Sequence, residues 1–228
     1  MQERVQKFIS QAGRASRREA ESFIKSGQVL INGRKAKLGD KVDPQTDEVK
    51  VYGKIVKPAE ENIYILLNKP KGYMVTKSDN LGRRTVFALL PKEIRTKVWN
   101  IGRLDFATEG LLLLTNDGEL TQMLSHPKYE HEKEYEAQVR DLPTSSQLEK
   151  LKSGMELKTG LASPAKAKVK NNRVYITIHE GKKHQVRNMF LKVGLELTNL
   201  KRIRIGKLFL PENLNVGQWK KIKKTDII

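Results

Sequence analysis

The chain has 228 residues, no cysteine and a formal net charge of +18, from 44 Lys and Arg against 26 Asp and Glu. The absence of cysteine excludes disulfides, thiolate nucleophiles and cysteine-based zinc sites. A hydrophobic content of 38% fits a globular protein, and the positive charge makes nucleic acid the leading candidate partner.

We predict that residues 1–58 form a small basic domain. Apolar residues recur at helical spacing over residues 5–12. Ser16-Arg17-Arg18-Glu19 matches a capping box at the start of a second helix. Val29-Leu30-Ile31 followed by Asn32-Gly33 predicts a β-hairpin, and residues 47–52 predict a further strand.

Basic side chains of this first domain fall in loops, on the polar side of a helix or at the hairpin. They are Arg14, Arg17, Arg18, Lys25, Arg34, Lys35 and Lys37. A solvated helix face is the usual meaning of a basic run. However, the order of helix, capped basic helix and VLINGRKAKLGDKV resembles the ribosomal-protein S-four type RNA-binding domain (the alpha-L motif). The resemblance implies that the second helix and the following loop bind structured RNA, with Arg14, Arg17, Arg18, Arg34 and Lys35 as RNA-binding residues.

A short polar linker is predicted at residues 59–62, followed by a second domain over residues 63–228. In that domain, strand-like runs alternate with helical ones. Strands are predicted at 63–67, 98–101, 111–115, 134–139, 174–178 and 195–203, and helices at 85–90, 119–124, 145–152 and 184–193. This mixture predicts an α+β fold with a mixed, mainly antiparallel sheet flanked by helices, rather than a doubly wound one.

The most informative stretch runs from Gly102 to Gly118 and reads GRLDFATEGLLLLTNDG. Its four leucines form an apolar run that suits a fully buried strand, and Asn116-Asp117-Gly118 is a turn signal. The carboxylate of Asp105 therefore precedes a buried strand, where rigid neighbours can support a catalytic group. An isolated aspartate would more often cap a turn or pair with a neighbour such as Arg103.

Three other segments carry polar residues suited to chemistry. Asn68-Lys69-Pro70-Lys71-Gly72 follows a strand and predicts a tight basic loop. Lys133-Glu134-Tyr135 opens a strand, and residues 181–189, GKKHQVRNM, begin a helix with concentrated positive charge. Together with the Asp105 stretch, their order and spacing closely resemble the RsuA-type pseudouridine synthases, which act on ribosomal RNA. The resemblance covers essentially the whole chain.

The resemblance implies a catalytic role for three residues. Asp105 would be the catalytic carboxylate, acting as a nucleophile, as a base toward the sugar, or as an electrostatic partner of a positive ribose. Tyr135 would stack on the uracil and assist loss of the proton at carbon 5. Arg187 would be the basic partner that keeps Asp105 ionised and aimed. Because the reaction involves no redox change and no supplied group, no cofactor is expected.

Further residues are expected to bind the RNA. Arg103 would contact phosphate or order the flipped nucleotide, with a structural salt bridge as the alternative. Leu200 would supply an apolar wall for the base, with core packing as the alternative. Lys69, Lys71, Lys182 and Lys183 would contact phosphates and so offset the cost of flipping, a few kcal/mol.

We expect the partner to be ribosomal RNA, free or in a ribosome-assembly intermediate, and the protein to be a monomer. The segment HPKYEHEKEYEAQV fits both small- and large-subunit enzymes, and we favour the large subunit. The N-terminus lacks the apolar core of a signal peptide, which predicts a cytoplasmic location. No stretch has the apolar length of a spanning helix, so no membrane association is expected.

Two rival functions have distinct requirements. A non-catalytic RNA-binding or ribosome-assembly factor would not depend on the Asp105 carboxylate. An aspartate-dependent nuclease or phosphotransferase usually needs clustered carboxylates that hold Mg²⁺, and the sequence offers no such cluster beside Asp105. The four histidines also lack metal-ligand spacing, so no metal site is expected.

Overall fold

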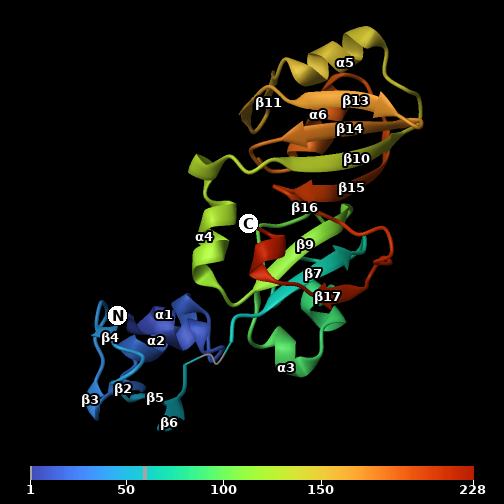
Figure 1. Cartoon of the computed structure of the whole chain (residues 1–228). Coiled ribbons are helices and arrows are strands. Elements are labelled where there is room, and N and C mark those ends of the chain that lie inside the picture. Colours follow the sequence, from blue (N-terminus) through green and yellow to red (C-terminus); the bar gives the residue numbers. More distant parts are fainter. Residues whose placement is uncertain (1, 59–60) are drawn as a thin grey trace. The chain divides into compact units, whose positions relative to one another are not determined.

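The computed structural model describes residues 2–58 and 61–228, which divide into two compact units (Figure 1). Unit 1 comprises Met1–Ile63, Pro91–Trp99 and Thr115–Gly118. Unit 2 comprises Tyr64–Leu90, Asn100–Leu114 and Glu119–Ile228. The domain limits drawn from the sequence stay a prediction, and the linker expected at 59–62 includes residues 59–60, which lie outside the described residues.

Unit 1 is built from short helices and strands, in close agreement with the sequence prediction. Its elements are β1 (Glu3–Arg4), α1 (Val5–Gln11), α2 (Arg17–Lys25), β2 (Val29–Ile31), β3 (Arg34–Lys35), β4 (Lys41–Val42), β5 (Val49–Val51), β6 (Lys54–Val56) and α3 (Lys92–Arg95). Strands β3, β2, β5 and β6 form one sheet in that order. The predicted helices, the hairpin and the strand near residue 50 are confirmed.

Local sequence signals explain these elements. The Ser16 side chain accepts a hydrogen bond from the Glu19 backbone N–H at 3.2 Å, and the Glu19 carboxylate accepts one from the Ser16 N–H at 2.8 Å. This confirms the capping box that starts α2. Asn32 and Gly33 both have positive φ, 49° and 81°, as a two-residue hairpin turn requires. Buried Ile9, Ile24 and their neighbours from α1, α2 and the strands form the core of the unit.

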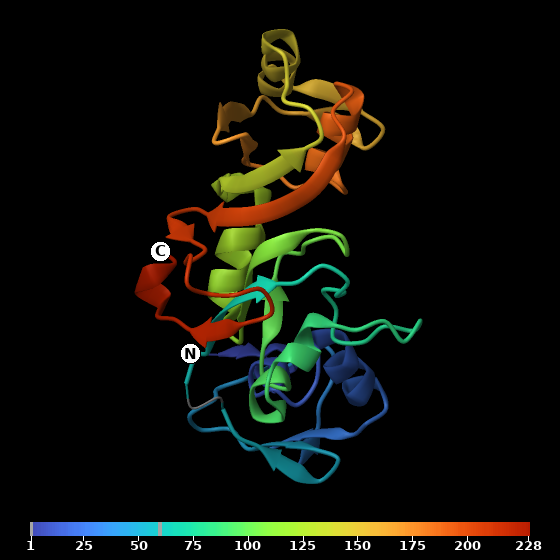
Figure 2. The same ribbon diagram turned by 90° about the vertical axis from the view of Figure 1, so that its right-hand side faces the viewer.

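Unit 2 and its borders carry a larger sheet (Figure 2). The strands of this part of the chain are β7 (Tyr64–Lys69), β8 (Trp99–Ile101), β9 (Glu109–Thr115), β10 (Lys133–Val139), β11 (Met155–Leu157), β12 (Gly160–Ala162), β13 (Lys166–Lys170), β14 (Arg173–Ile178), β15 (Leu197–Ile205), β16 (Leu208–Phe209) and β17 (Trp219–Lys221). Strands β11 and β12 pair with each other as a separate two-stranded sheet. The helices are α4 (Gly118–Ser125), α5 (Ser145–Lys152) and α6 (Gln185–Lys192). Three 3₁₀ turns lie at η1 (Val86–Leu89), η2 (Pro127–Tyr129) and η3 (Lys224–Asp226).

The sheet confirms the α+β prediction. In the described part of the chain its main path runs β13-β14-β10-β15-β9-β7-β17, with β16 beside β15 and β8 beside β9. The pairs β13/β14, β14/β10, β10/β15 and β7/β17 are antiparallel, whereas β15 and β9 are parallel. The sheet is therefore mixed and mainly antiparallel, as expected.

Two local predictions were wrong. Residues 85–90 form only the short 3₁₀ turn η1, because Leu90 precedes Pro91 and a residue before proline is pushed out of the helical region; Leu90 has φ −104° and ψ 148°. The loop expected at residues 68–72 begins later, because β7 continues through Asn68 and Lys69. There the Asn68 N–H donates to the Gln218 carbonyl, at 2.9 Å.

Strand β9 is the buried strand that the leucine run predicted. Leu111 to Leu114 are each at most 1% exposed. Leu111 and Leu113 pack with Leu120 and Leu124 of α4, and successive side chains of a strand point to opposite faces, so Leu112 and Leu114 fill the other side. A strand held on both faces gives the preceding loop, with Asp105, a rigid support.

Gly110 of β9 allows the closest backbone approach near this loop. It pairs in parallel register with Arg202 of β15 and has φ +106°. A Cβ at this position would lie 2.7 Å from the Arg202 backbone nitrogen and closer still to its carbonyl oxygen. Only glycine therefore lets β9 and β15 meet at this point.

We expect Gly110→Ala to lower the free energy of unfolding by at least about 3 kcal/mol, because the clash is with backbone that cannot rotate away. Gly217→Ala is the matched control: Gly217 also has positive φ, +85°, but no described atom lies within 4 Å of its Cβ position. That control should cost about 1 kcal/mol. Urea unfolding followed by circular dichroism would measure both, and equal losses would contradict the close approach.

Candidate active site

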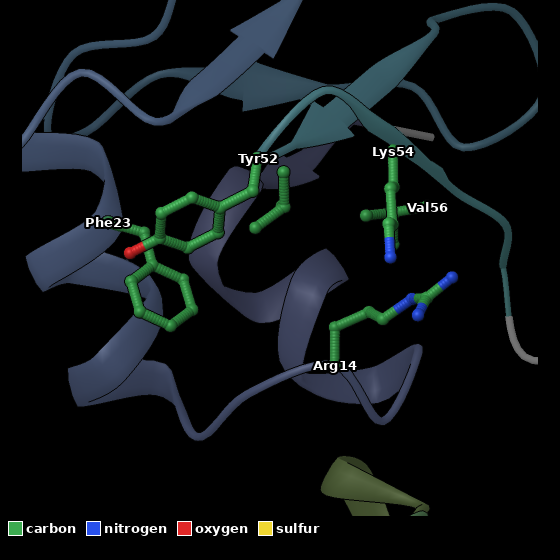
Figure 3. A pocket seen from close by; sticks show the side chains of 6 residues that line it. Arg14, Phe23, Tyr52, Lys54 and Val56 are labelled. Atoms are coloured by element: carbon green, nitrogen blue, oxygen red, sulfur yellow. The ribbon is translucent and has the colours of Figure 1, made fainter.

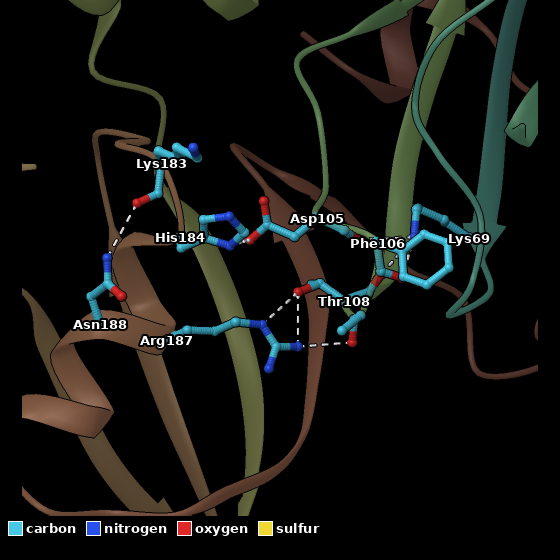
Figure 4. A network of polar contacts seen from close by, with 9 residues as sticks. Lys69, Asp105, Phe106, Thr108, Lys183, His184, Arg187 and Asn188 are labelled. Atoms are coloured by element: carbon cyan, nitrogen blue, oxygen red, sulfur yellow. Dashed lines mark hydrogen bonds and ion pairs between the residues drawn. The ribbon is translucent and has the colours of Figure 1, made fainter. Parts of the chain in front are cut away.

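The Asp105 carboxylate lies in the loop that leads into β9, with its side chain 36% exposed. Its Oδ2 atom is 3.1 Å from Nδ1 of His184, the residue that precedes α6 (Figure 4). In the described part of the chain, His184 is the only ionisable side chain within ion-pair distance of this carboxylate. The local sequence pattern does not predict this role of His184, because its partner lies 79 positions away in the chain.

The backbone at His184 is held in an uncommon conformation. His184 has φ 54° and ψ 25°, in the left-handed region that costs a non-glycine residue about 1–2 kcal/mol. The buried Gln185 side chain fixes this turn: its Oε1 accepts from the Lys182 N–H at 2.9 Å, and its Nε2 donates to Glu180 at 2.6 Å. The turn thus presents His184 to Asp105.

Arg187 lies beside the same loop but bonds to a different part of it. Its Nη2 donates to the Ala107 carbonyl at 2.8 Å and to the Thr108 hydroxyl at 3.1 Å, and its Nε lies 3.3 Å from that hydroxyl (Figure 4). The expected pairing with the Asp105 carboxylate is therefore not formed here. The start of α6 instead contacts the loop at two places. Arg187 bonds to the Ala107 carbonyl and the Thr108 hydroxyl, and His184, just before the helix, contacts the Asp105 carboxylate.

Lys69 holds the loop from the interior. Its side chain is fully buried, and Nζ donates to the carbonyls of Thr108 at 2.8 Å, Pro70 at 3.0 Å and Asp105 at 3.1 Å, with Phe106 at 3.5 Å. The expectation that Lys69 contacts RNA phosphate is wrong, because its ammonium group is enclosed by protein carbonyls. Its place at the end of buried β7 explains the difference.

Three buried or partly buried basic residues lie in the strands near the Asp105 loop: Lys69 of β7, Lys133 of β10 and Arg202 of β15. Burial lowers the pKa of Lys69 to about 8, while the nearby carboxylates of Asp105 and Glu109 act in the opposite direction. Burial also lowers the pKa of Lys133, and the positive charge of Arg202 adds to that effect. Arg202 is 3% exposed and donates through Nε to the Leu111 carbonyl at 2.9 Å. Its Nη2 has no hydrogen-bond partner among the described residues.

The sheet register relates Tyr135 to the Asp105 segment. Gly110 of β9 pairs with Arg202 of β15, which pairs with Tyr135 of β10. Tyr135 therefore lies two strands away from the segment that carries Asp105. The tyrosine is 8% exposed, so little of its ring is open to a base in this state.

Leu200 is a core residue. It is 2% exposed and lies opposite Ala137 of β10, which is itself fully buried. The expectation of an apolar wall for the base is corrected in favour of the alternative, core packing, because an inward-facing position of a central strand offers no surface to a ligand.

The other basic residues of unit 2 that were expected to bind RNA differ in whether their side chains are free to do so. Lys71, Arg103 and Lys183 are exposed, and the described residues offer their side chains no hydrogen bond or ion pair, so the salt bridge considered for Arg103 is not formed. Lys182 is engaged by the Glu180 carboxylate and by the Leu161 carbonyl, at 2.7 Å from the latter.

Unit 1 contributes its own exposed cations. Arg14, Arg17, Arg18 and Lys35 are exposed, and Arg34 pairs with Asp40 at 3.1 Å. No three His, Asp or Glu side chains within residues 2–58 and 61–228 come together as a metal site would require. No helix in the same ranges is long and apolar enough to cross a membrane.

Comparison with known protein families identifies both parts of the sequence. Residues 63–192 match the family model described as RNA pseudouridylate synthase. Residues 3–49 match the S4 domain, which agrees with the resemblance noted for the capped basic helix and the hairpin.

Individual relatives extend over nearly all of the chain. An uncharacterized RNA pseudouridine synthase of Aquifex aeolicus is 42% identical, over 100% of this chain and 93% of the relative. The ribosomal large subunit pseudouridine synthase B of Bacillus subtilis is 45% identical, over 88% of this chain and 84% of the relative. Among solved structures, a pseudouridylate synthase matches with a TM-score of 0.72 and 29% identity, covering 98% of this chain and 97% of the other.

The burial of Lys69 predicts a pH-dependent stability. The Lys69 ammonium group has a pKa of about 8 in the folded chain against 10.5 for an unburied lysine, so between these values the unfolded chain binds more protons and stability rises with pH. From about pH 7.5 to about pH 9.5 the wild type should gain roughly 2 kcal/mol relative to Lys69→Met.

Urea unfolding at several pH values would measure this difference. Lys71→Met serves as the control, because Lys71 is an exposed neighbour and its loss should leave the slope of the wild type unchanged. A parallel pH dependence of the wild type and Lys69→Met would contradict the buried charge.

Proposed function

The chain belongs to the RNA pseudouridylate synthase family and carries an S4 domain ahead of its synthase region, and we propose that Asp105 is its catalytic residue for isomerising one uridine of large-subunit ribosomal RNA. One observation carries the assignment of Asp105. Its carboxylate is partly exposed, while its loop is anchored from the interior by Lys69 and from α6 by Arg187. A reactive group needs this combination of access and rigid support.

The choice of the large subunit rests on relatives. The Bacillus subtilis protein and a 39% identical protein of Vibrio vulnificus are both named ribosomal large subunit pseudouridine synthase B. We propose the same class of substrate for this chain, as free ribosomal RNA or within an assembly intermediate. We also propose that the protein acts as a monomer in the cytoplasm, where ribosomal RNA is made and assembled.

The proposed reaction is an isomerisation in which atoms balance without a second substrate. The bond between ribose carbon 1′ and uracil nitrogen 1 breaks, the base turns, carbon 1′ joins carbon 5, and the carbon 5 proton is replaced by one at nitrogen 1. The Asp105 carboxylate acts on the sugar as a nucleophile or a base, or stabilises a positive ribose. Tyr135 is proposed to contact the uracil and to assist removal of the carbon 5 proton.

His184 and Arg187 are proposed to position Asp105. His184 Nδ1 lies 3.1 Å from one oxygen of the carboxylate and so fixes its orientation, while the Asp105 side chain stays 36% exposed. Arg187 holds the loop through two acceptors, Ala107 and Thr108, a geometry that suits the planar fork of arginine. The target uridine must leave its stack to reach this site, which costs a few kcal/mol. Phosphate contacts by the exposed Lys71, Arg103 and Lys183 would offset that cost.

Asp105→Asn should abolish the modification of one ribosomal RNA position, with turnover reduced at least roughly 100-fold, because the amide keeps the shape of the side chain but not its charge. Carbodiimide mapping of pseudouridines in a strain that lacks the protein would show the missing position. Wild type should restore it and Asp105→Asn should not.

Two outcomes of that experiment would count against the proposal. A map without any missing position would contradict ribosomal RNA as the substrate, and restoration by Asp105→Asn would favour the non-catalytic RNA-binding factor. Activity of the purified protein that disappears with a chelator would favour the rival that depends on Mg²⁺.

Arg187→Lys and His184→Ala should each lower kcat about tenfold or more while RNA affinity changes less than about threefold, because both residues orient Asp105 rather than grip RNA. Leu191→Gln is a control on the same helix, since Leu191 is 76% exposed and its apolar side chain makes no hydrogen bond to the loop. Single-turnover kinetics with a ribosomal RNA fragment separates the two quantities. Loss of affinity with an unchanged kcat would contradict positioning.

A further inference from the structure

Unit 1 contains a pocket that lies outside the catalytic site (Figure 3). Its volume is about 290 Å³, at the lower end of the range for small-ligand sites. The lining residues are Arg14, Phe23, Val51, Tyr52, Lys54 and Val56. They all come from α2, the turn before it and the β5–β6 hairpin, so the pocket belongs to unit 1 alone.

The pocket has three chemically distinct sides. Buried Val51 and Val56 provide an apolar lining. The rings of Phe23 and Tyr52 meet edge to face, with centroids 5.1 Å apart and planes at 73°. Figure 3 shows Lys54 and Arg14 across from this aromatic pair. An apolar, aromatic pocket with cations on one side suits a flat aromatic ligand that carries negative charge.

Tyr52 is an exposed aromatic residue with an unfavourable backbone conformation. Its side chain is 58% exposed, although it lies beside the core of unit 1. It occupies the turn of the β5–β6 hairpin with φ 48°, followed by Gly53 with φ 73°, and such turns favour asparagine or glycine over tyrosine. The Tyr52 N–H donates to the Gln28 carbonyl at 2.9 Å, which holds the turn. A large aromatic residue in a strained, exposed position favours a binding role over packing.

Two cationic side chains of the pocket are available to bind a negatively charged part of a ligand. Arg14 and Lys54 are exposed, and the structure, over its described residues, assigns their side chains no hydrogen bond or ion pair. Both can therefore bind phosphate. In an RNA duplex the base faces are covered by stacking, whereas an unpaired base can place its face on an aromatic ring. The combination fits a nucleotide that has left its helix.

We propose that this pocket binds one unpaired nucleotide of the RNA, with the base on Tyr52 and Phe23 and the flanking phosphates on Arg14 and Lys54. The inference rests on the proposed function for the identity of the RNA. It adds that unit 1 recognises an unpaired nucleotide, such as a bulged or loop base. This recognition is separate from the electrostatic attraction of RNA by the other basic residues of the unit.

The test uses the full chain and two RNA probes. One probe is a duplex with a single bulged 2-aminopurine, and the other is the same duplex without the bulge. Wild type should bind the bulged probe roughly 5- to 100-fold more tightly, as expected for one stacked base, and quench its fluorescence. Tyr52→Asn, which suits the positive φ but removes the ring, should bind both probes equally.

Two controls separate stacking from other effects. Tyr52→Phe should keep the preference, because it keeps the ring. Val216→Asn should also keep it, because Val216 is an exposed apolar residue, 52% exposed, that lies outside the pocket and outside the basic segments expected to bind RNA. If Tyr52→Asn fails to fold, the double variant Arg14→Gln/Lys54→Gln replaces it. The slope of log affinity against log salt concentration for the bulged probe should then be shallower by about two, because two phosphate contacts are lost.

Equal binding of both probes by wild type would overturn the inference, as would a preference that survives in Tyr52→Asn or an unchanged salt slope in the double variant. These measurements report binding without turnover. Failure of the proposed function would instead show as an absence of pseudouridine formation on ribosomal RNA by wild type, whatever the outcome with the two probes.

Discussion

The ammonium group of Lys69 lies in the protein interior, where a positive charge is stable only if surrounding acceptors replace water. The carbonyls of Pro70, Asp105 and Thr108 are those acceptors. Because each must stay within bonding distance, the loop before β9 is tied to the end of β7 and has little freedom to move. The position of the Asp105 carboxylate therefore depends on a lysine that is itself fully buried.

The rest of the site is arranged around this anchored loop. Strand β9 is buried on both faces, and Gly110 lets β15 approach it closely, which places Arg202 and then Tyr135 in register beside it. Helix α6 closes the other side through Arg187 and His184. Rigidity is thus concentrated around the Asp105 carboxylate, and the positive charges of this region favour the approach of a polyanion.

The two units present complementary chemistry to RNA. Unit 2 offers the partly exposed Asp105 carboxylate close to buried and exposed cations, an arrangement that suits the proposed reaction on one sugar. Unit 1 offers exposed cations and an aromatic pocket around Tyr52, which suits docking of RNA and recognition of an unpaired nucleotide. Under the proposed function, the energy of docking on unit 1 would offset the cost of flipping the target base.

Structural features that depend on neighbouring residues could be predicted from the sequence. The capping box at Ser16, the Asn32-Gly33 hairpin and the buried leucine run of β9 follow from local preferences, and all three are confirmed. The α+β fold followed from the alternation of such patterns, and the motif order indicated Asp105. Lys69 looked the same as any basic residue of a loop, since a sequence does not state whether a charge is buried.

Contacts between distant segments were decided only by the tertiary structure. The strand register buries Leu200, the close approach at Gly110 depends on a strand more than 80 residues away, and the left-handed turn at His184 sets its contact with Asp105. Lys69 became an anchor because folding placed carbonyl groups around it, and Arg187 became a partner of the loop because folding placed the Ala107 carbonyl and the Thr108 hydroxyl beside it. The sequence determined which residues are candidates for the chemistry, because motifs are local. The packing of β7, β9, β15 and α6 determined which groups each of them contacts, because those contacts join segments far apart in the chain.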